Sequence, residues 1–255
     1  MIKFNQNITV SSDKVKTGNT AGKAVEDCIV RLLETKKEVR IIFAAAPSQN
    51  SMLNYVTNSK LIDWSKIVTF HMDEYIGLKE NASELFSSYL EDHLFSKVTV
   101  KQKNTINVHN GIAEELARYE KLLSEEKIDI VCLGIGENGH IAFNDPPVAD
   151  FNDPKVIKVV ELDDACRIQQ VNDACFDTFN DVPEKAITLT IPTLMNANHL
   201  FCVVLGTKKS EAVKNTLSGV ISTACPASIL TTHPDCKFYF DEKAFSKNKE
   251  ITKAI

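Results

Sequence analysis

IDIVCLGIGENGHIAFNDPP, residues 128–147, joins a run of apolar residues to a polar loop that contains three glycines. The apolar run is short and rich in β-branched residues, which is typical of a strand covered on both faces. The glycines, of which Gly136 is the middle one, fit the G-x-G-x-x-G pattern of dinucleotide-binding loops, but that pattern must open a helix. The prolines at 146–147 would stop a helix within two turns. The stretch therefore predicts a buried strand and a loop that approaches a small ligand closely.

Similar strand-like segments recur along the chain and alternate with helical periods. Short runs rich in β-branched or aromatic residues lie at 39–46, 66–72, 128–136, 156–162, 186–191 and 199–206. Apolar residues within 21–33 and 112–123 recur with the spacing of an amphipathic helix. Since no repeat or long linker interrupts this alternation, we predict one α/β domain over residues 1–255, with a mostly parallel sheet flanked by helices.

Composition narrows the class of protein. Of the 255 residues, 44% are hydrophobic and 25% are charged, as in ordinary soluble globular proteins. A net charge of -5 without a basic block gives no reason to expect a nucleic-acid partner, and no apolar run reaches the ~18 residues of a membrane span. The cysteines are odd in number and lack C-x-x-C spacing, and the N-terminal stretch lacks the apolar core of a signal peptide. We therefore expect a cytoplasmic protein with free thiols.

Polar loops follow four of the apolar stretches. They read APSQN at 46–50, DEYIGL at 73–78, GENGHIAFNDPP at 136–147 and GTKK at 206–209. Ligands of open α/β sheets bind beyond the carboxyl ends of the strands, so we expect these loops to meet on one rim and to form the site.

Titratable side chains in two of these loops suit proton transfer. Asp73 and Glu74 follow a buried strand directly, so one of them could be a general base, or both could be solvated acids. His140 has Asn138 and Asp145 nearby, and an acid–base imidazole needs polar partners that fix its tautomer. A purely structural histidine is the other interpretation. The histidines lack the spacing of a metal site, so no metal is predicted.

Two stretches are candidates for binding an anion. GTKK heads a predicted helix and combines backbone amides with Lys209, although two lysines on a solvated turn would look the same. Arg167 could clamp a phosphate or lie on the surface.

VTFHMDEYIGL at 68–78 and LGIGENGHIAFNDP at 133–146 together resemble the two signature stretches of the glucosamine-6-phosphate deaminase/isomerase family, whose superfamily includes the 6-phosphogluconolactonases. The resemblance extends from about the first predicted helix to residues 231–241. It implies a modified doubly wound α/β fold with helices on both faces of the sheet. It also implies conversion of glucosamine 6-phosphate, or its galactosamine epimer, to fructose 6-phosphate and ammonia without metal or organic cofactor. Relatives include monomers and hexamers, so the resemblance allows a homo-oligomer.

The resemblance also implies catalytic roles. Asp73 would move a proton from C2 of the open-chain sugar to C1, and His140 would move the proton that opens the pyranose ring. Where the family has an Asp-x-His…Glu set, this chain has Asn138, His140 and Asp145. Asparagine can orient an imidazole but adds no negative charge, and aspartate is one carbon shorter than glutamate.

Phosphate binding is implied for the remaining loops. Lys209, aligned through LGTKK, would bind the phosphate, and Arg167 is the arginine that best fits as its partner. Ser48, Gln49 and amides near Gly136 would add contacts, although the family's TGGT phosphate loop reads Ala-Pro-Ser-Gln in this chain.

Three functions remain open on the sequence. The first is an amino-sugar-phosphate deaminase or isomerase. The second is a lactone hydrolase of the 6-phosphogluconolactonase type, but those relatives carry Asp-Glu-Arg where this chain has Asp-Glu-Tyr, and they lack the AFND continuation. The third is a sugar-phosphate-binding protein without activity, for which Asp73 and His140 would be unnecessary.

Overall fold

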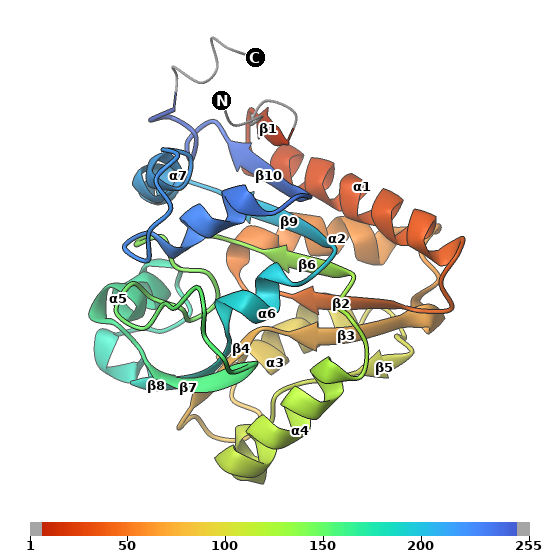
Figure 1. Cartoon of the computed structure of the whole chain (residues 1–255), viewed down its shortest axis with the longest axis horizontal. Helices are drawn as coiled ribbons and strands as arrows, with labels where there is room; N and C mark the ends of the chain where they lie inside the picture. The colour runs from red at the N-terminus through yellow and green to blue at the C-terminus, as the bar shows by residue number, and fades with distance from the viewer. Residues whose placement is uncertain (1–6, 249–255) are drawn as a thin grey trace.

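The computed structural model describes residues 7–248, and its centre is a seven-stranded sheet in which every pair of neighbours is parallel (Figure 1). In spatial order the strands are β1 (Ile8–Ser11), β10 (Cys236–Asp241), β9 (His199–Val204), β6 (Ile130–Leu133), β2 (Val39–Phe43), β3 (Ile67–His71) and β5 (Gln102–Lys103). The predicted fold class is thereby confirmed. The two ends of the predicted 1–255 domain, including most of the N-terminal stretch judged to lack a signal peptide, lie outside the described residues.

A second, smaller sheet is antiparallel and was not predicted. It consists of β4 (Asp73–Ile76), β8 (Lys185–Leu189) and β7 (Ile157–Glu161), in that order. Two segments that the sequence analysis assigned to strands, 156–162 and 186–191, therefore lie outside the parallel sheet. β7 is only partly buried: Ile157 and Val160 are buried, whereas Val159 keeps 40% of its surface exposed. Antiparallel sheets tolerate such exposure, whereas the strands of parallel sheets are usually covered on both faces.

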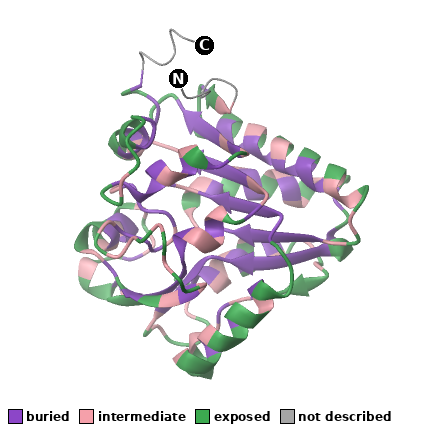
Figure 2. Cartoon of the chain, viewed as in Figure 1, coloured by how far each residue is buried: buried purple, intermediate pink, exposed green. Residues whose placement is uncertain are grey.

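Helices cover both faces of the parallel sheet because its strands are apolar on both sides. All residues of β2, β3 and β6 are buried (Figure 2). Their apolar residues alternate along each strand between two hydrophobic clusters. Ile41 packs in one cluster with α1 and α2, whereas Ile42 packs in the other with α4 and α7.

The helices have the following bounds. The α-helices are α1 (Lys14–Leu33), α2 (Asn50–Asn58), α3 (Phe86–Leu90), α4 (Ile112–Ser124), α5 (Asp164–Asn172), α6 (Ile191–Met195) and α7 (Ser210–Thr216). Short 3-10 helices are η1 (Pro47–Gln49), η2 (Trp64–Lys66), η4 (Val108–Asn110), η5 (Phe179–Asp181), η6 (Thr207–Lys209) and η7 (Pro226–Thr232), and η3 (Glu91–Phe95) is a π-helical turn. None of the described helices is both long and apolar enough to cross a lipid bilayer.

Sequence signals account for the longest helix. Asp13 caps α1 by accepting hydrogen bonds from the amides of Val15 and Lys16, at 3.0 and 2.9 Å. A Cβ added to Gly22 would lie 2.6 Å from Cβ of Tyr55, so glycine at this position lets α1 and α2 pack closely. This pair covers the face of the sheet that carries Ile41.

Candidate active site

The loops that follow β2, β6 and β9 meet at the carboxyl ends of these strands, as predicted. Gln49, in η1 after β2, donates from Nε2 to Oγ of Ser48 at 2.9 Å and to the carbonyl oxygens of Leu133 and Val203 at 3.3 and 3.5 Å. The fully buried side chain of Gln49 thus ties three strand ends together.

The small sheet brings Asp73 to this rim. Asp73 begins β4 and lies opposite Thr188 of β8. Oγ1 of Thr188 accepts a hydrogen bond from the amide of Phe143 at 3.1 Å, and the side chain of Asn144 donates to the carbonyl oxygen of Leu189 at 2.9 Å. The loop that contains His140 is therefore fastened to the strand beside Asp73.

The two adjacent acids at this strand have different surroundings. Glu74 accepts hydrogen bonds from the amides of Tyr75, Phe86 and Ser87 at 2.9–3.0 Å, so its carboxylate holds the start of α3. Burial raises the pKa of Asp73 well above its ordinary value, and the carboxylates of Glu74 and Asp145 raise it further. Within residues 7–248 no hydrogen bond offsets this shift. Of the two acids, only Asp73 has the properties of a strong, unengaged base.

His140 has a carboxylate partner in Asp145. Nδ1 of His140 lies 2.9 Å from Oδ1 of Asp145, and both residues are buried. Burial alone would raise the pKa of Asp145, but contacts with His140, Asn138 and Cys166 lower it overall. The Asp145 carboxylate is therefore charged near neutral pH and can stabilise a protonated imidazole.

Asn138 holds this pair together. Its Nδ2 donates to Oδ1 of Asp145 at 2.9 Å, and its Oδ1 accepts from the amide of His140 at 3.1 Å. The aspartate that the family pattern would place at 138 is thus replaced by a donor, and the negative charge beside His140 comes from Asp145.

Glycine at 136 is required by the His140 side chain and not by a nucleotide. A Cβ on Gly136 would lie 2.3 Å from Cε1 of the imidazole, so the ring rests directly on this residue. The amide of Gly136 donates to the carbonyl oxygen of His140 at 2.9 Å. Gly139 has φ +88°, and no helix follows it before α5. The loop therefore lacks the helix start that a dinucleotide site needs.

Lys209 lies at the end of η6 and faces the same loop. Burial lowers its pKa, and the carboxylates of Asp173 and Glu137 oppose that shift. A half-buried lysine with a lowered pKa loses less hydration when it meets an anion than a fully solvated one.

A profile of the family described as glucosamine-6-phosphate isomerases/6-phosphogluconolactonase matches residues 12–238. The chain belongs to this family. Glucosamine-6-phosphate deaminases of Bacillus thuringiensis (strain Al Hakam) and Bacillus anthracis (strain CDC 684 / NRRL 3495) are each 35% identical to it over 233 residues, 91% of this chain and 87% of theirs.

Solved structures agree with this family. A monomeric glucosamine-6-phosphate deaminase superposes with a TM-score of 0.84 at 27% identity, over 95% of this chain and 100% of that one. The 6-phosphogluconolactonase of Trypanosoma brucei superposes with a TM-score of 0.80 over 96% of this chain and 99% of that one. Its 14% identity makes this a likeness of fold alone.

Three residues that the resemblance to the deaminase/isomerase family assigned to phosphate binding make hydrogen bonds within the protein. Nη2 of Arg167 donates to the carbonyl oxygens of Phe179 and Val182 at 3.2 and 2.9 Å, and its guanidinium lies 4.0 Å from the centroid of the Phe179 ring. The side chain of Gln49 and the amide of Gly136 already have partners within the protein. These contacts give all three residues structural roles.

Helix α5 forms one wall of the site, which sequence reasoning missed. Oε1 of Gln169 accepts from the amide of Glu137 at 2.6 Å, and Oε1 of Gln170 accepts from the hydroxyl of Tyr75 at 2.7 Å. Cys166 is fully buried beside Asp145. Spacings of three and four residues place Cys166, Gln169 and Gln170 on one helix face, which was the available signal.

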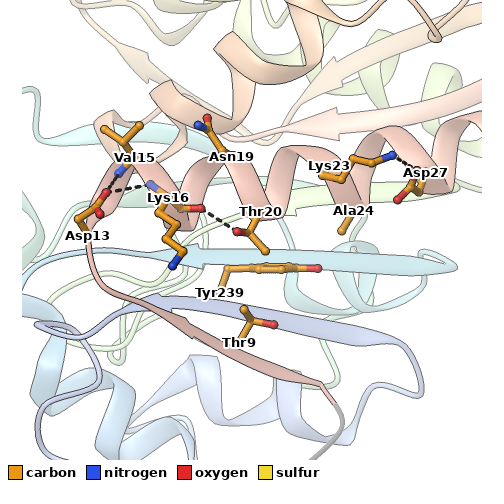
Figure 3. Close-up of a pocket in the computed structure, with 10 residues that line it drawn as sticks. All are labelled: Thr9, Asp13, Val15, Lys16, Asn19, Thr20, Lys23, Ala24, Asp27 and Tyr239. Atoms are coloured by element: carbon orange, nitrogen blue, oxygen red, sulfur yellow. Dashed lines mark hydrogen bonds and ion pairs between the residues drawn. The ribbon is translucent and has the colours of Figure 1, made fainter.

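A hollow in another part of the molecule has a volume of about 670 Å³. It runs along α1 between Asp13 and Asp27, above Thr9 and Tyr239 (Figure 3). None of the candidate catalytic or phosphate-binding residues lines it.

Proposed function

We propose that this protein is an amino-sugar-phosphate deaminase/isomerase, which converts glucosamine 6-phosphate or its galactosamine epimer and water to fructose 6-phosphate and ammonia. The observation that carries the proposal is the Asp73 carboxylate, which is buried, has a raised pKa and lies near the His140–Asp145 pair. The curated relatives that are 35% identical are glucosamine-6-phosphate deaminases, which supports the same function.

Asp73 is the base of the proposed reaction. Its carboxylate takes the proton from C2 of the open-chain sugar and returns it to C1, while a second proton passes from the amino nitrogen to the oxygen on C1, which leaves an imine at C2. Water then adds to the imine, and ammonia leaves with formation of the ketone. A carboxylate whose pKa is raised by burial is a stronger base than a solvated one, and its activity is lost as the pH falls through that raised pKa.

His140 opens the sugar ring in this proposal. Its imidazole takes the proton from the hydroxyl on C1 and delivers it to the ring oxygen, so that it is transiently protonated. Asp145, 2.9 Å away, stabilises this charged form. These steps are proton transfers between the substrate and this chain's own side chains.

The phosphate is assigned to a smaller set of residues than the sequence suggested. Lys209 supplies the positive charge, and the Ser48 hydroxyl is the second proposed contact. Ser48 supports this role by its place beside the Gly134 backbone, where an added Cβ would lie 3.4 Å from Oγ. Arg167 and Gln49 are left out because Nη2 of Arg167 and Nε2 of Gln49 already donate hydrogen bonds within the protein.

Ammonia release is the direct test of this function. The purified protein should release ammonia from one of a panel of amino-sugar 6-phosphates, with 6-phosphogluconolactone assayed alongside. Asp73→Asn should lower turnover by ~100-fold or more, the scale for loss of a general base. The wild type should also exchange the C2 proton of its substrate with deuterium in D₂O, and the variant should not. Hydrolysis of the lactone without ammonia release would contradict the proposal.

A further inference from the structure

Three potential metal ligands meet beside the catalytic pair. Ligand atoms of His140, Asp145 and Cys166 all lie within 4.8 Å of one another, and all three residues are buried. We refer to these residues as the thiol cluster. Cys166 lies in α5 and the other two residues lie in the loop after β6, so the spacing of these residues in the sequence does not predict a metal site.

Two polar atoms in the thiol cluster lack an aligned hydrogen bond. Nδ1 of His140 is buried and has only its ion-pair contact with Oδ1 of Asp145, whose angle does not suit a hydrogen bond. Oδ2 of Asp145 is buried and has no hydrogen-bond partner among the described residues. Leaving buried polar atoms unpaired costs free energy, about 1–3 kcal/mol for each group. A bound cation would satisfy both atoms at once.

The charges around the thiol cluster also favour a cation. Asp145 is a buried carboxylate with the buried carboxylate of Asp73 nearby, so negative charge gathers beside the thiol cluster. A divalent ion would displace the proton of the buried Cys166 thiol. The resulting thiolate together with one carboxylate would balance the two charges of the ion.

We propose that the thiol cluster binds Zn²⁺ and that the bound metal inhibits the enzyme. One sulfur, one imidazole nitrogen and one carboxylate oxygen form a set that suits zinc, with one tetrahedral position left for water. The His140 side chain is 10% exposed, which gives the ion access from solvent. A metal-bound imidazole cannot relay a proton to the sugar ring, so inhibition follows from binding.

Metal binding can be tested without any assumption about the reaction. Chelator-treated protein is titrated with ZnCl₂ by calorimetry, and with CdCl₂ while the ultraviolet thiolate–cadmium absorbance is followed. The wild type should bind one ion per chain in the thiol cluster. Cys166→Ser should weaken binding by roughly tenfold or more, since changes even outside the ligand shell weaken metal sites that much. Cys175→Ser, at a half-buried cysteine outside the thiol cluster, is the matched control and should bind as the wild type does.

His140→Ala provides a second test that does not depend on how well Cys166→Ser folds, and it should also weaken Zn²⁺ binding. Wild-type affinity for Zn²⁺ in both variants would show that the thiol cluster is not a metal site.

The proposal that zinc inhibits the enzyme rests on the proposed function. Ammonia release by the wild type should stop when Zn²⁺ is added and return when a chelator removes it. Ammonia release by Cys166→Ser should persist in the presence of Zn²⁺. Full ammonia release by a zinc-loaded wild type would overturn inhibition. Zinc binding that requires Cys166, in a protein that releases no ammonia, would uphold the site while the proposed function failed.

Discussion

Nδ1 of His140 lies 2.9 Å from Oδ1 of Asp145, and this pair is assembled entirely within one loop. Asn138 bonds to both members, and Gly136 leaves room for the imidazole. Ala142 lies between the two residues and has φ +48°, a strained conformation for a residue other than glycine. The chain turns at this position, and His140 and Asp145 meet. The loop thus replaces an aspartate at 138 and a glutamate at 145 with a single charged partner for the histidine.

Asp145→Asn tests whether this charge supports proton transfer. Without the carboxylate the protonated imidazole loses its stabilisation, so kcat should fall by about 100-fold, as for other proton-transfer groups, with little change in KM. Asp145→Glu keeps the charge and should retain more activity than the asparagine variant. Steady-state ammonia release measures both variants. Equal activity of the two would show that the charge has no part in catalysis.

Asp73→Asn should make the protein more stable at pH 7. Burial, and then Glu74 and Asp145, raise the pKa of Asp73 in the folded protein. Between the unfolded-state value of about 3.9 and the raised value, the folded state binds more protons than the unfolded state, so stability falls as pH rises. Removal of this carboxylate should therefore raise Tm at pH 7, and the gain should vanish below about pH 4.

Thermal melts followed by circular dichroism between pH 4 and 8 measure this effect. Glu74→Gln is the matched control, because it replaces an oxygen that accepts backbone hydrogen bonds from α3. It should destabilise the protein by about 1–3 kcal/mol. A lower Tm for Asp73→Asn than for the wild type at pH 7 would show that the buried Asp73 carboxylate does not destabilise the folded protein.

Lys209→Ala should raise KM for the phosphorylated sugar by at least about tenfold, because a charge-assisted contact contributes about 1.5–3 kcal/mol. Lys208, its exposed neighbour in η6, offers the control. Lys208→Ala should leave KM near the wild-type value. Equal effects of the two substitutions would reduce the role of Lys209 to general surface charge.

Arg167→Gln should lower stability without changing KM. Its guanidinium bonds to the carbonyl oxygens of Phe179 and Val182 and stacks on the Phe179 ring, and hydrogen bonds to charged groups contribute about 1.5–3 kcal/mol. Urea unfolding and steady-state kinetics on the same preparation separate the two effects. An increase in KM with unchanged stability would show that Arg167 binds the phosphate.

The core strands of the parallel sheet and the position of the candidate site at their carboxyl ends could be predicted from periodicity. The strands β2, β3, β6 and β9 were predictable because burial on both faces demands nearly continuous apolar runs. Asp73 and His140 could be selected because polar residues directly after such strands must lie at the carboxyl edge of the sheet. Periodicity carries this information, since it records which faces of an element are buried.

Which side chains meet at this edge of the sheet depends on how distant segments pack together. The pairing of β4 with β8 joins Asp73 to Thr188, far away in the sequence, and thereby fastens the His140 loop beside it. Arg167 was predicted to bind phosphate, and the structure shows that its Nη2 donates to the carbonyl oxygens of Phe179 and Val182. Cys166 reaches Asp145 only because α5 packs over the loop. Hydrogen bonds and charge pairs depend on distances of a few ångströms between distant segments, and hydrophobic periodicity does not encode those distances.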